Sequence, residues 1–243
     1  MTASRHCSAI VLAMAVLGTS SAHVRSQDDK GSWGSVRGRI VWREGETPPM
    51  TLEVEKDGKG VRWAFVWLAP ADERVKVPVH PSLSKVAERF VHISLDGSGF
   101  RPRCLGLRVG QDVTISNLDA VARAVRWDPC GSDNPAGATL IPNGGRWNLE
   151  GLRASSRLPI SLSLSVFGNR DAAAYLHAFD HPYWQVTDAD GQFELKQAPA
   201  GSWQLYVWHP DVGWRGGKKG RNGEKISIRP GQTTVLDALP LNP

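Results

Sequence analysis

The chain has 243 residues, of which 41% are hydrophobic, an ordinary share for a globular protein that excludes a mainly disordered chain. Lys and Arg outnumber Asp and Glu by 29 to 24, and the positive charges are scattered except in one Gly-rich loop that carries Arg215, Lys218, Lys219 and Arg221. No nucleic-acid motif accompanies this loop, so a solvated tip is favoured over contact with nucleic acid or an anionic glycan. Plentiful Gly and Pro are typical of many short strands joined by tight turns.

Residues 1–22 have the pattern of a secretory signal peptide, with a positive start, an apolar run at 9–18 and small residues Ser20 and Ala22 before a cleavage point. The apolar run is shorter than the ~20 residues of a spanning helix, which favours a cleaved peptide over an anchor. We therefore expect a periplasmic or secreted protein with no membrane span in the mature chain. Residues 23–33 are polar and predict a flexible leader.

Beyond the leader, short segments with period-two hydrophobicity recur about every ten residues with turn signals between them. A single helical turn is expected within 79–86 and a loop over 128–145. The expected strands are 36–42, 51–55, 61–68, 90–95, 104–109, 112–117, 124–127, 158–167, 175–179, 183–187, 192–195, 203–208, 225–228 and 233–239. No long segment keeps a 3.6-residue period, so the sequence predicts an all-β sandwich protein.

The strongest strand signal is the segment 61–68, VRWAFVWL, which is apolar on both faces. Alternation assigns Trp63, Phe65 and Trp67 to one face of this strand. Ala64, Val66 and Leu68 fall on the other face. This pattern indicates a central strand that is buried on both sides.

Two blocks of the sequence resemble known families. In the first, Phe100-x-Pro102 is followed by residues 110–119, GQDVTISNLD, which is similar to the opening of a cupredoxin. In that family the first copper-binding His comes just after this segment. The alternating segment 161–167 resembles the strand that ends on the ligand Cys, with a His and then a Met a few residues later.

The second block comprises 187–195 (TDADGQFEL), 199–201 (PAG) and 205–209 (LYVWH). It is similar to the carboxypeptidase-regulatory-like, or transthyretin-like, β module. The two blocks, bridged by 181–184 (HPYW), resemble exported cupredoxin-like proteins of planctomycete-type bacteria, sometimes labelled methylamine-utilisation proteins. The resemblance implies a Greek-key cupredoxin-like sandwich combined with a transthyretin-like β-sandwich module.

Two domain arrangements agree with these blocks. In the favoured one, residues 34–87 plus 183–243 form the transthyretin-like module, and 88–182 form an inserted cupredoxin-like domain. In the alternative, two domains follow one another and divide near Tyr183.

The family's copper ligands are not present at the positions where the resemblance places them. A blue-copper site needs two imidazoles, a thiolate and a weak axial thioether. Laid on the family's pattern, these four ligands fall at Arg123, Val166, Asn169 and Ala172, and the segment 163–174 contains no Cys, His or Met. The resemblance therefore implies the fold without the copper, and we expect no cofactor.

A relocated metal site is the first alternative. His177 and His181 are four residues apart, so on a strand they point to one face, and His209 could join them after a chain reversal. Such a site would make the chain a periplasmic copper-binding or electron-transfer protein. No carboxylate or Cys completes the ligand set, so packing of these histidines near strand ends is favoured.

The remaining signals predict no enzyme. Asp188, Asp190 and Gly191 fit a β-turn better than a Ca²⁺ loop, which needs more oxygen ligands and a distal Glu. No Gly-x-Ser-x-Gly elbow is present. We expect an exported, non-catalytic binding or structural protein whose partner is another exported protein or a glycan.

Two further features stay open from the sequence. Cys104 and Cys130 could form a disulfide in an oxidising compartment, provided that they lie close together. The tryptophans Trp63, Trp67, Trp203 and Trp208 could form an aromatic platform for sugar rings, which would make the chain a carbohydrate-binding module. Aromatic side chains more often supply core area.

Overall fold

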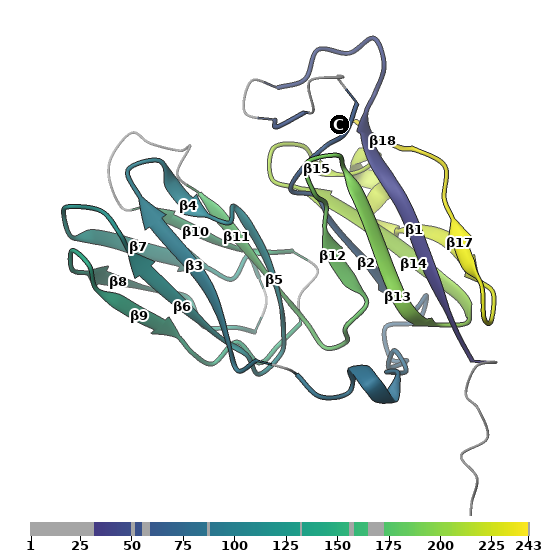
Figure 1. The fold of residues 1–243 in the computed structure, drawn as a ribbon, viewed down its shortest axis with the longest axis horizontal. Helices are drawn as coiled ribbons and strands as arrows, with labels where there is room; N and C mark the ends of the chain where they lie inside the picture. Colours follow the sequence, from purple (N-terminus) through teal and green to yellow (C-terminus); the bar gives the residue numbers. More distant parts are fainter. Residues whose placement is uncertain are drawn as a thin grey trace, which may run out of the picture.

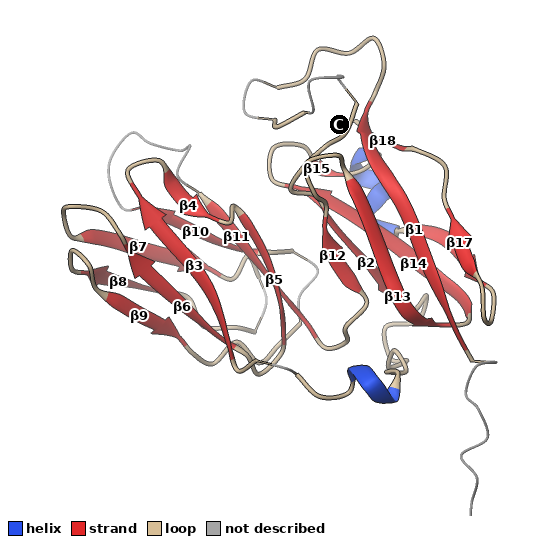
Figure 2. Cartoon of the chain, viewed as in Figure 1, coloured by secondary structure: helices blue, strands red, loops and turns tan. Residues whose placement is uncertain are grey.

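The computed structural model describes residues 32–49, 52–54, 59–86, 88–131, 133–155, 158–164 and 173–242. Regular structure in these residues is nearly all β, with two short 3-10 helices, η2 (Pro81–Leu83) and η3 (Gly217–Asn222) (Figure 2). The predicted all-β sandwich class is thereby confirmed. Among the described residues, no helix has the length and apolar character needed to cross a bilayer. The predicted signal peptide, 1–22, lies outside the described residues.

The strands form two sandwiches that lie side by side (Figure 1). In the first, which we call the terminal sandwich, one sheet contains β13 (Gln192–Pro199), β1 (Trp33–Trp42), β17 (Thr233–Val235) and β18 (Leu239–Leu241). Its other sheet contains β12 (Trp184–Val186), β2 (Phe65–Ala69), β14 (Gly201–His209), β15 (Gly213–Trp214) and β16 (Glu224–Ile228). Strands from both ends of the described chain therefore share one sheet, since β1 pairs in parallel with β17 and β18.

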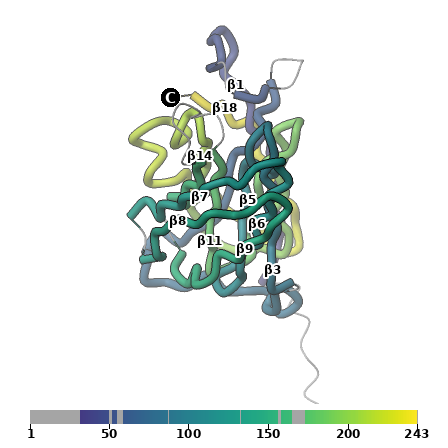
Figure 3. Tube along the Cα trace, turned by 90° about the vertical axis from the view of Figure 1, so that its left-hand side faces the viewer, coloured from purple at the N-terminus to yellow at the C-terminus, as the bar shows by residue number. Residues whose placement is uncertain are grey.

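The second, which we call the central sandwich, is built from the strands between β2 and β12. One sheet has the order β4 (Gly99–Arg101), β3 (Phe90–Asp96), β6 (Asp112–Asn117) and β9 (Arg146–Leu149). The other has the order β5 (Cys104–Arg108), β11 (Ala174–Phe179), β10 (Ile160–Leu164), β7 (Arg123–Asp128) and β8 (Gly137–Ile141). Figure 3 looks at the molecule from this side. The domain boundaries at residues 87–88 and 182–183 remain a prediction.

Each sandwich has its own apolar core. The core of the terminal sandwich includes Val36 and Ile40 from one sheet and Val66 and Leu68 from the other. The core of the central sandwich is formed in the same way, with side chains from all of its longer strands. Each Å² of apolar surface that these side chains remove from water stabilises the fold by ~25 cal/mol, and this burial is the main driving force for both sandwiches.

A third, aromatic cluster joins the two sandwiches. Phe65 and Trp67 project from β2 on the face opposite the terminal core and pack with Phe179 of β11. Trp184 of β12 stacks on Phe179 with ring centroids 5.1 Å apart, and it covers Gly106 so closely that a Cβ on this glycine would clash with the indole. The alternation expected for 61–68 is therefore confirmed, and its aromatic face forms the contact between the sandwiches.

Several strand predictions were wrong in detail. The predicted loop 128–145 contains β8, which pairs with the preceding strand β7, and β9 follows this segment. Each of these strands has only one buried residue, Ile141 in β8 and Leu149 in β9, so hydrophobic alternation gave little local signal. Of the predicted strand 51–55 the structure describes residues 52–54, which contain only a bridge from Val54 to Val61. The strand predicted for 61–68 begins only at Phe65, because Trp63 adopts a positive φ of 72° that interrupts the extended backbone.

Candidate functional site

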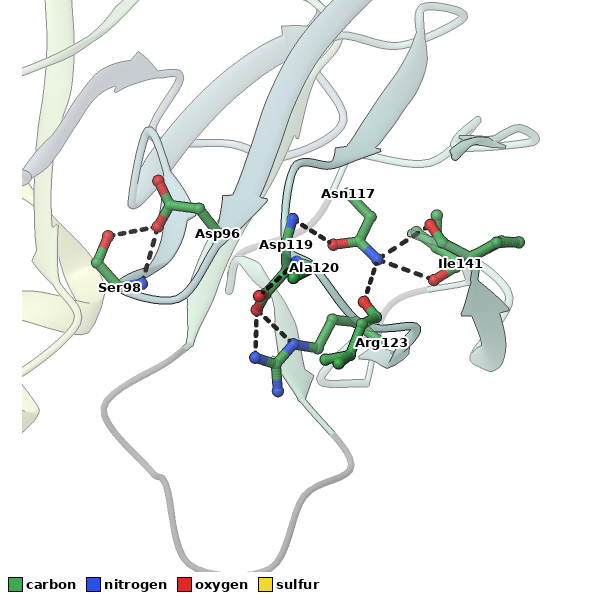
Figure 4. Close-up of polar contacts among 9 residues, drawn as sticks. Asp96, Ser98, Asn117, Asp119, Ala120, Arg123 and Ile141 are labelled. Atoms are coloured by element: carbon green, nitrogen blue, oxygen red, sulfur yellow. Dashed lines mark hydrogen bonds and ion pairs between the residues drawn. The ribbon is translucent and has the colours of Figure 1, made fainter. Parts of the chain in front are cut away.

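The position that the resemblance assigns to the first copper ligand lies at the start of β7. Before it, the loop that follows β6 is fixed by Asn117, a fully buried side chain. Its Nδ2 donates to the carbonyls of Val121, Ile141 and Pro142 at 2.9, 3.0 and 3.0 Å, and its Oδ1 accepts from the backbone N–H of Asp119 at 3.0 Å (Figure 4). This one side chain therefore ties the loop to the end of β8.

Arg123 fills the first-ligand position with an ion pair. Its Nε donates to Oδ2 of Asp119 at 2.7 Å, and its Nη2 contacts the same oxygen (Figure 4). Both side chains are mostly buried, with 24% and 15% of their surface exposed. A guanidinium has no lone pair to offer a metal and stays charged, so this residue does not fit copper.

The other three assigned ligand positions, Val166, Asn169 and Ala172, lie outside the described residues. Their side chains offer a copper ion neither sulfur nor imidazole nitrogen. Trigonal copper needs such donors, so the residues present do not fit the metal that the resemblance implies.

The three histidines of the alternative metal site do not come together. Among the residues that the structure describes, no group of three His, Cys, Asp or Glu side chains is arranged to hold a metal ion. His177 packs between aromatic rings, with Trp67 at 4.8 Å and Phe179 at 4.1 Å between centroids. The less favoured alternative, a metal site at His177, His181 and His209, is therefore not formed in the structure, because the latter two use their ring nitrogens to hold backbone groups.

His209 and His181 have the same role in two different turns. The Nδ1 of His209 accepts from the N–H of Asp211 at 3.1 Å, so its Nε2 carries the proton and donates to the carbonyl of Arg62 at 2.9 Å. The Nδ1 of His181 likewise accepts from the N–H of Tyr183 at 3.1 Å. Burial lowers the pKa of each imidazole to about 4, so both rings are neutral at physiological pH.

Cys104 and Cys130 are free cysteines in the structure, so the disulfide that the sequence allowed is not formed. Cys104 is on β5, whereas Cys130 follows β7, and β11 and β10 lie between these strands. Three strand spacings of ~4.8 Å separate the two strands, about twice the ~7 Å that a disulfide spans between Cα atoms. Burial raises the pKa of the Cys104 thiol, so this residue behaves as a small core side chain.

The four tryptophans do not form one platform. Trp203 packs in the core of the terminal sandwich and donates its Nε1–H to the carbonyl of Pro199 at 2.7 Å. Trp67 is buried between the sandwiches, and Trp63 and Trp208 pack against it from the rim of that aromatic cluster. Because Trp203 and Trp67 lie on opposite faces of one sheet, the possible platform of Trp63, Trp67, Trp203 and Trp208 is not formed, and Trp67 and Trp203 instead supply core area, the favoured alternative.

The basic loop and the acidic turn have local roles. Lys218, Lys219 and Arg221 are exposed on η3, whereas Arg215 contacts the Glu224 carboxylate. Asp188 closes a β-turn by accepting from the N–H groups of Asp190 and Gln192 at 3.0 and 2.8 Å. The carboxylate is thus engaged with backbone donors, as expected for a turn rather than a Ca²⁺ loop.

A cleft of about 710 Å³ opens between the two sandwiches, next to the aromatic cluster. This volume is within the ~300–1,000 Å³ that is usual for ligand sites. The lining side chains are both aromatic and charged. They are Glu53, Arg62, Trp63, Ser98, Phe100, Arg101, Pro102, Arg103, Ala173, Tyr175 and Asp211. Sequence reasoning missed this site because it draws on separate segments of both sandwiches and has no local motif.

A strained turn brings two of these residues into the cleft. Trp63, with its positive φ of 72°, is held by Thr187, a buried residue at the end of β12. The Oγ1 of Thr187 donates to the carbonyl of Val61 at 2.8 Å and accepts from the N–H of Ala64 at 2.9 Å, and its carbonyl accepts from the N–H of Trp63. A non-glycine residue with a left-handed backbone conformation costs on the order of 1–3 kcal/mol, so the contacts around Trp63 must impose this conformation.

No protein-family model matches the sequence, and no curated protein matches it either. Solved structures that resemble part of the chain include a purple cupredoxin from Nitrosopumilus maritimus, with 14% identity and a TM-score of 0.29 over 36% of this chain and 98% of that one. Oxidised plastocyanin from Dryopteris crassirhizoma has 10% identity and a TM-score of 0.31 over 37% and 100%. A Cu(I) amicyanin variant has 12% identity and a TM-score of 0.32 over 48% and 98%. All three are proteins of the family that the first block of the sequence resembles.

Proposed function

We propose that the chain is an exported, non-catalytic binding protein that combines a cupredoxin-like sandwich with a transthyretin-like β module and does not hold copper. The observation that carries the proposal is the Arg123–Asp119 ion pair at the first-ligand position. A cation fixed by its own carboxylate partner occupies the place of an imidazole, and it repels a metal ion by its charge.

The cleft between the sandwiches supports the binding part of the proposal. Its charged lining groups include the bidentate Arg103–Asp211 pair, and no Ser–His or Cys–His arrangement for nucleophilic chemistry lies among its lining residues. A site that offers aromatic surface and charged hydrogen-bond donors without a nucleophile and its base suits reversible binding.

Copper titration of the mature chain tests this proposal. We expect neither Cu(I) nor Cu(II) to form a tight one-to-one complex, and no thiolate-to-copper absorption in the visible region, because the assigned positions lack the donors. A stoichiometric complex with strong visible absorption would contradict the proposal. Replacing His177 and His181 by Ala would then show whether those histidines supply the ligands.

A further inference from the structure

The arginines of the cleft differ in how closely their side chains are paired with carboxylates. Arg103 forms a bidentate pair with Asp211 at 2.8 and 2.6 Å, and both side chains are largely buried. Arg62 and Arg101 instead approach carboxylates only at 3.7 Å, and their side chains are 42% and 69% exposed. Such long, exposed ion pairs contribute little free energy, so either guanidinium can exchange its partner for a ligand at small cost.

Arg62 is oriented before any ligand arrives. Its Cζ lies over the ring of Trp63 at 4.3 Å, which holds the guanidinium plane against the indole. The backbone of the turn is fixed by Thr187 and by the hydrogen bond from His209 to the Arg62 carbonyl. A planar guanidinium in a fixed orientation is suited to two parallel hydrogen bonds with a carboxylate.

Arg101 faces the same cleft from the central sandwich. It ends β4, and its Nη2 and Nε donate to Ser98 Oγ at 2.9 and 3.2 Å. The cleft lining carries three arginines against Glu53 and Asp211, and Asp96 lies 3.7 Å from Arg101. The exposed guanidiniums of Arg62 and Arg101, one from each sandwich, can therefore each bind an anionic group of a ligand that reaches from one sandwich to the other.

The apolar part of the cleft is made of rings. Tyr175 of β11 is half-buried, with its ring edge-on to Trp208 at 5.3 Å, and Phe100 and Pro102 lie beside it in the lining. Aromatic faces between hydrogen-bonding groups fit the alternation of C–H faces and hydroxyls on a sugar ring. A peptide is less well matched, since β4, the edge strand beside the cleft, offers only three residues for strand pairing.

From this combination we propose that the cleft binds a glycan that carries carboxylate groups, such as a chain of uronic acids. Arg62 and Arg101 each bind a carboxylate of the glycan, and a sugar ring between them packs on Tyr175. Arg103, locked by Asp211, donates to ring hydroxyls. The inference deepens the proposed binding role by naming the ligand class, and it is independent of whether copper binds.

Calorimetric titration of the mature chain with trigalacturonate at neutral pH tests the proposal. We expect one-to-one binding that weakens as NaCl is raised, because the contacts are between exposed charges. Neutral galactotriose should bind at least about tenfold more weakly, since it cannot form the charge-assisted hydrogen bonds. Equal binding of the two sugars, or no binding of trigalacturonate, would overturn the proposal, as would tighter binding of a sulfated trisaccharide or of an oligoglutamate peptide.

Two variants place the ligand in the cleft. Arg62→Gln and Arg101→Gln should each weaken binding by about tenfold or more, whereas Arg126→Gln, on the exposed face of β7, should change it by less than about twofold. Arg101 is largely exposed, so its variant should melt at the wild-type temperature and report on binding alone even if Arg62→Gln disturbs the turn. Unchanged affinity in the Arg101 variant would place the ligand elsewhere and overturn the assignment.

Discussion

Unfolding measurements should show a loss of several kcal/mol of stability as the pH falls from about 6.5 to about 4. The two buried imidazoles His181 and His209 cause this loss, since burial lowers the pKa of each from 6.5 to about 4. In the window between these values the unfolded chain binds a proton on each histidine and the folded chain does not. Folding stability therefore decreases with decreasing pH within the window and changes no further from these groups below it.

The size of the effect follows from the width of the window. Each histidine contributes on the order of 3 kcal/mol, so the pair removes about 6 kcal/mol of a total that is usually 5–15 kcal/mol. Nearby charges shift the pKa values of these histidines in both directions and do not cancel the lowering that burial causes. Asp180 and Asp211 raise the pKa of His181 and His209 respectively, and Arg108 and Arg103 lower them.

Urea titrations at a series of pH values measure this dependence. His209→Gln should reduce the slope between pH 6.5 and 4 by about half, and His92→Gln, a change at an exposed residue of β3, should leave it unaltered. A stability that is flat across the window in the wild-type chain would show that these histidines are already charged or that they are hydrated in the folded state.

Asn117→Asp should destabilise the chain by roughly 3–5 kcal/mol, the second large effect that we expect. The Nδ2 of Asn117 donates to three backbone carbonyls, and the substitution puts a carboxylate oxygen in its place. The buried carbonyl of Ile141 and the part-buried carbonyls of Val121 and Pro142 then lose their donor and face a group that repels them. The loop that carries Asp119 and leads to Arg123 should lose its order together with these bonds.

Asn148→Asp is the matched control for this substitution. Asn148 is exposed on β9, and its Oδ1 accepts from Thr114 Oγ1 at 2.9 Å, a bond that a carboxylate oxygen also accepts. Thermal unfolding followed by circular dichroism should show a lower midpoint for Asn117→Asp and nearly the wild-type midpoint for the control. Equal midpoints for both variants would mean that the Asn117 bonds contribute little to the stability of this loop.

Hydrophobic alternation was sufficient to predict most of the strands. Segments such as 36–42, 90–95, 112–117 and 203–208 are strands in the structure because each presents one apolar face to a core. The two faces of the segment 61–68 were also predicted, since they follow from period two alone. What the aromatic face packs against was not, because Phe179 and Trp184 come from strands more than 100 residues later.

The candidate site could not be predicted from sequence patterns either, because its contacts also join residues that are far apart in the sequence. Thr187 fixes the conformation of Trp63 across 124 residues of chain, and Asp211 fixes Arg103 across 108. Neither pair has a sequence spacing from which the contact could be predicted. The absence of copper ligands, in contrast, can be read directly from the sequence. The ion pair between Arg123 and Asp119 that replaces the first ligand cannot be predicted in this way.

The thermal midpoint of the mature chain, measured with excess Cu(II) and again with EDTA, tests the central proposal, that the sandwich whose sequence resembles a cupredoxin is complete without copper. A metal that binds only the folded state raises the midpoint by mass action. We predict the same midpoint in both solutions, because Arg123 and Asp119 already satisfy one another at the first-ligand position. A midpoint that is several degrees higher with copper would contradict this account.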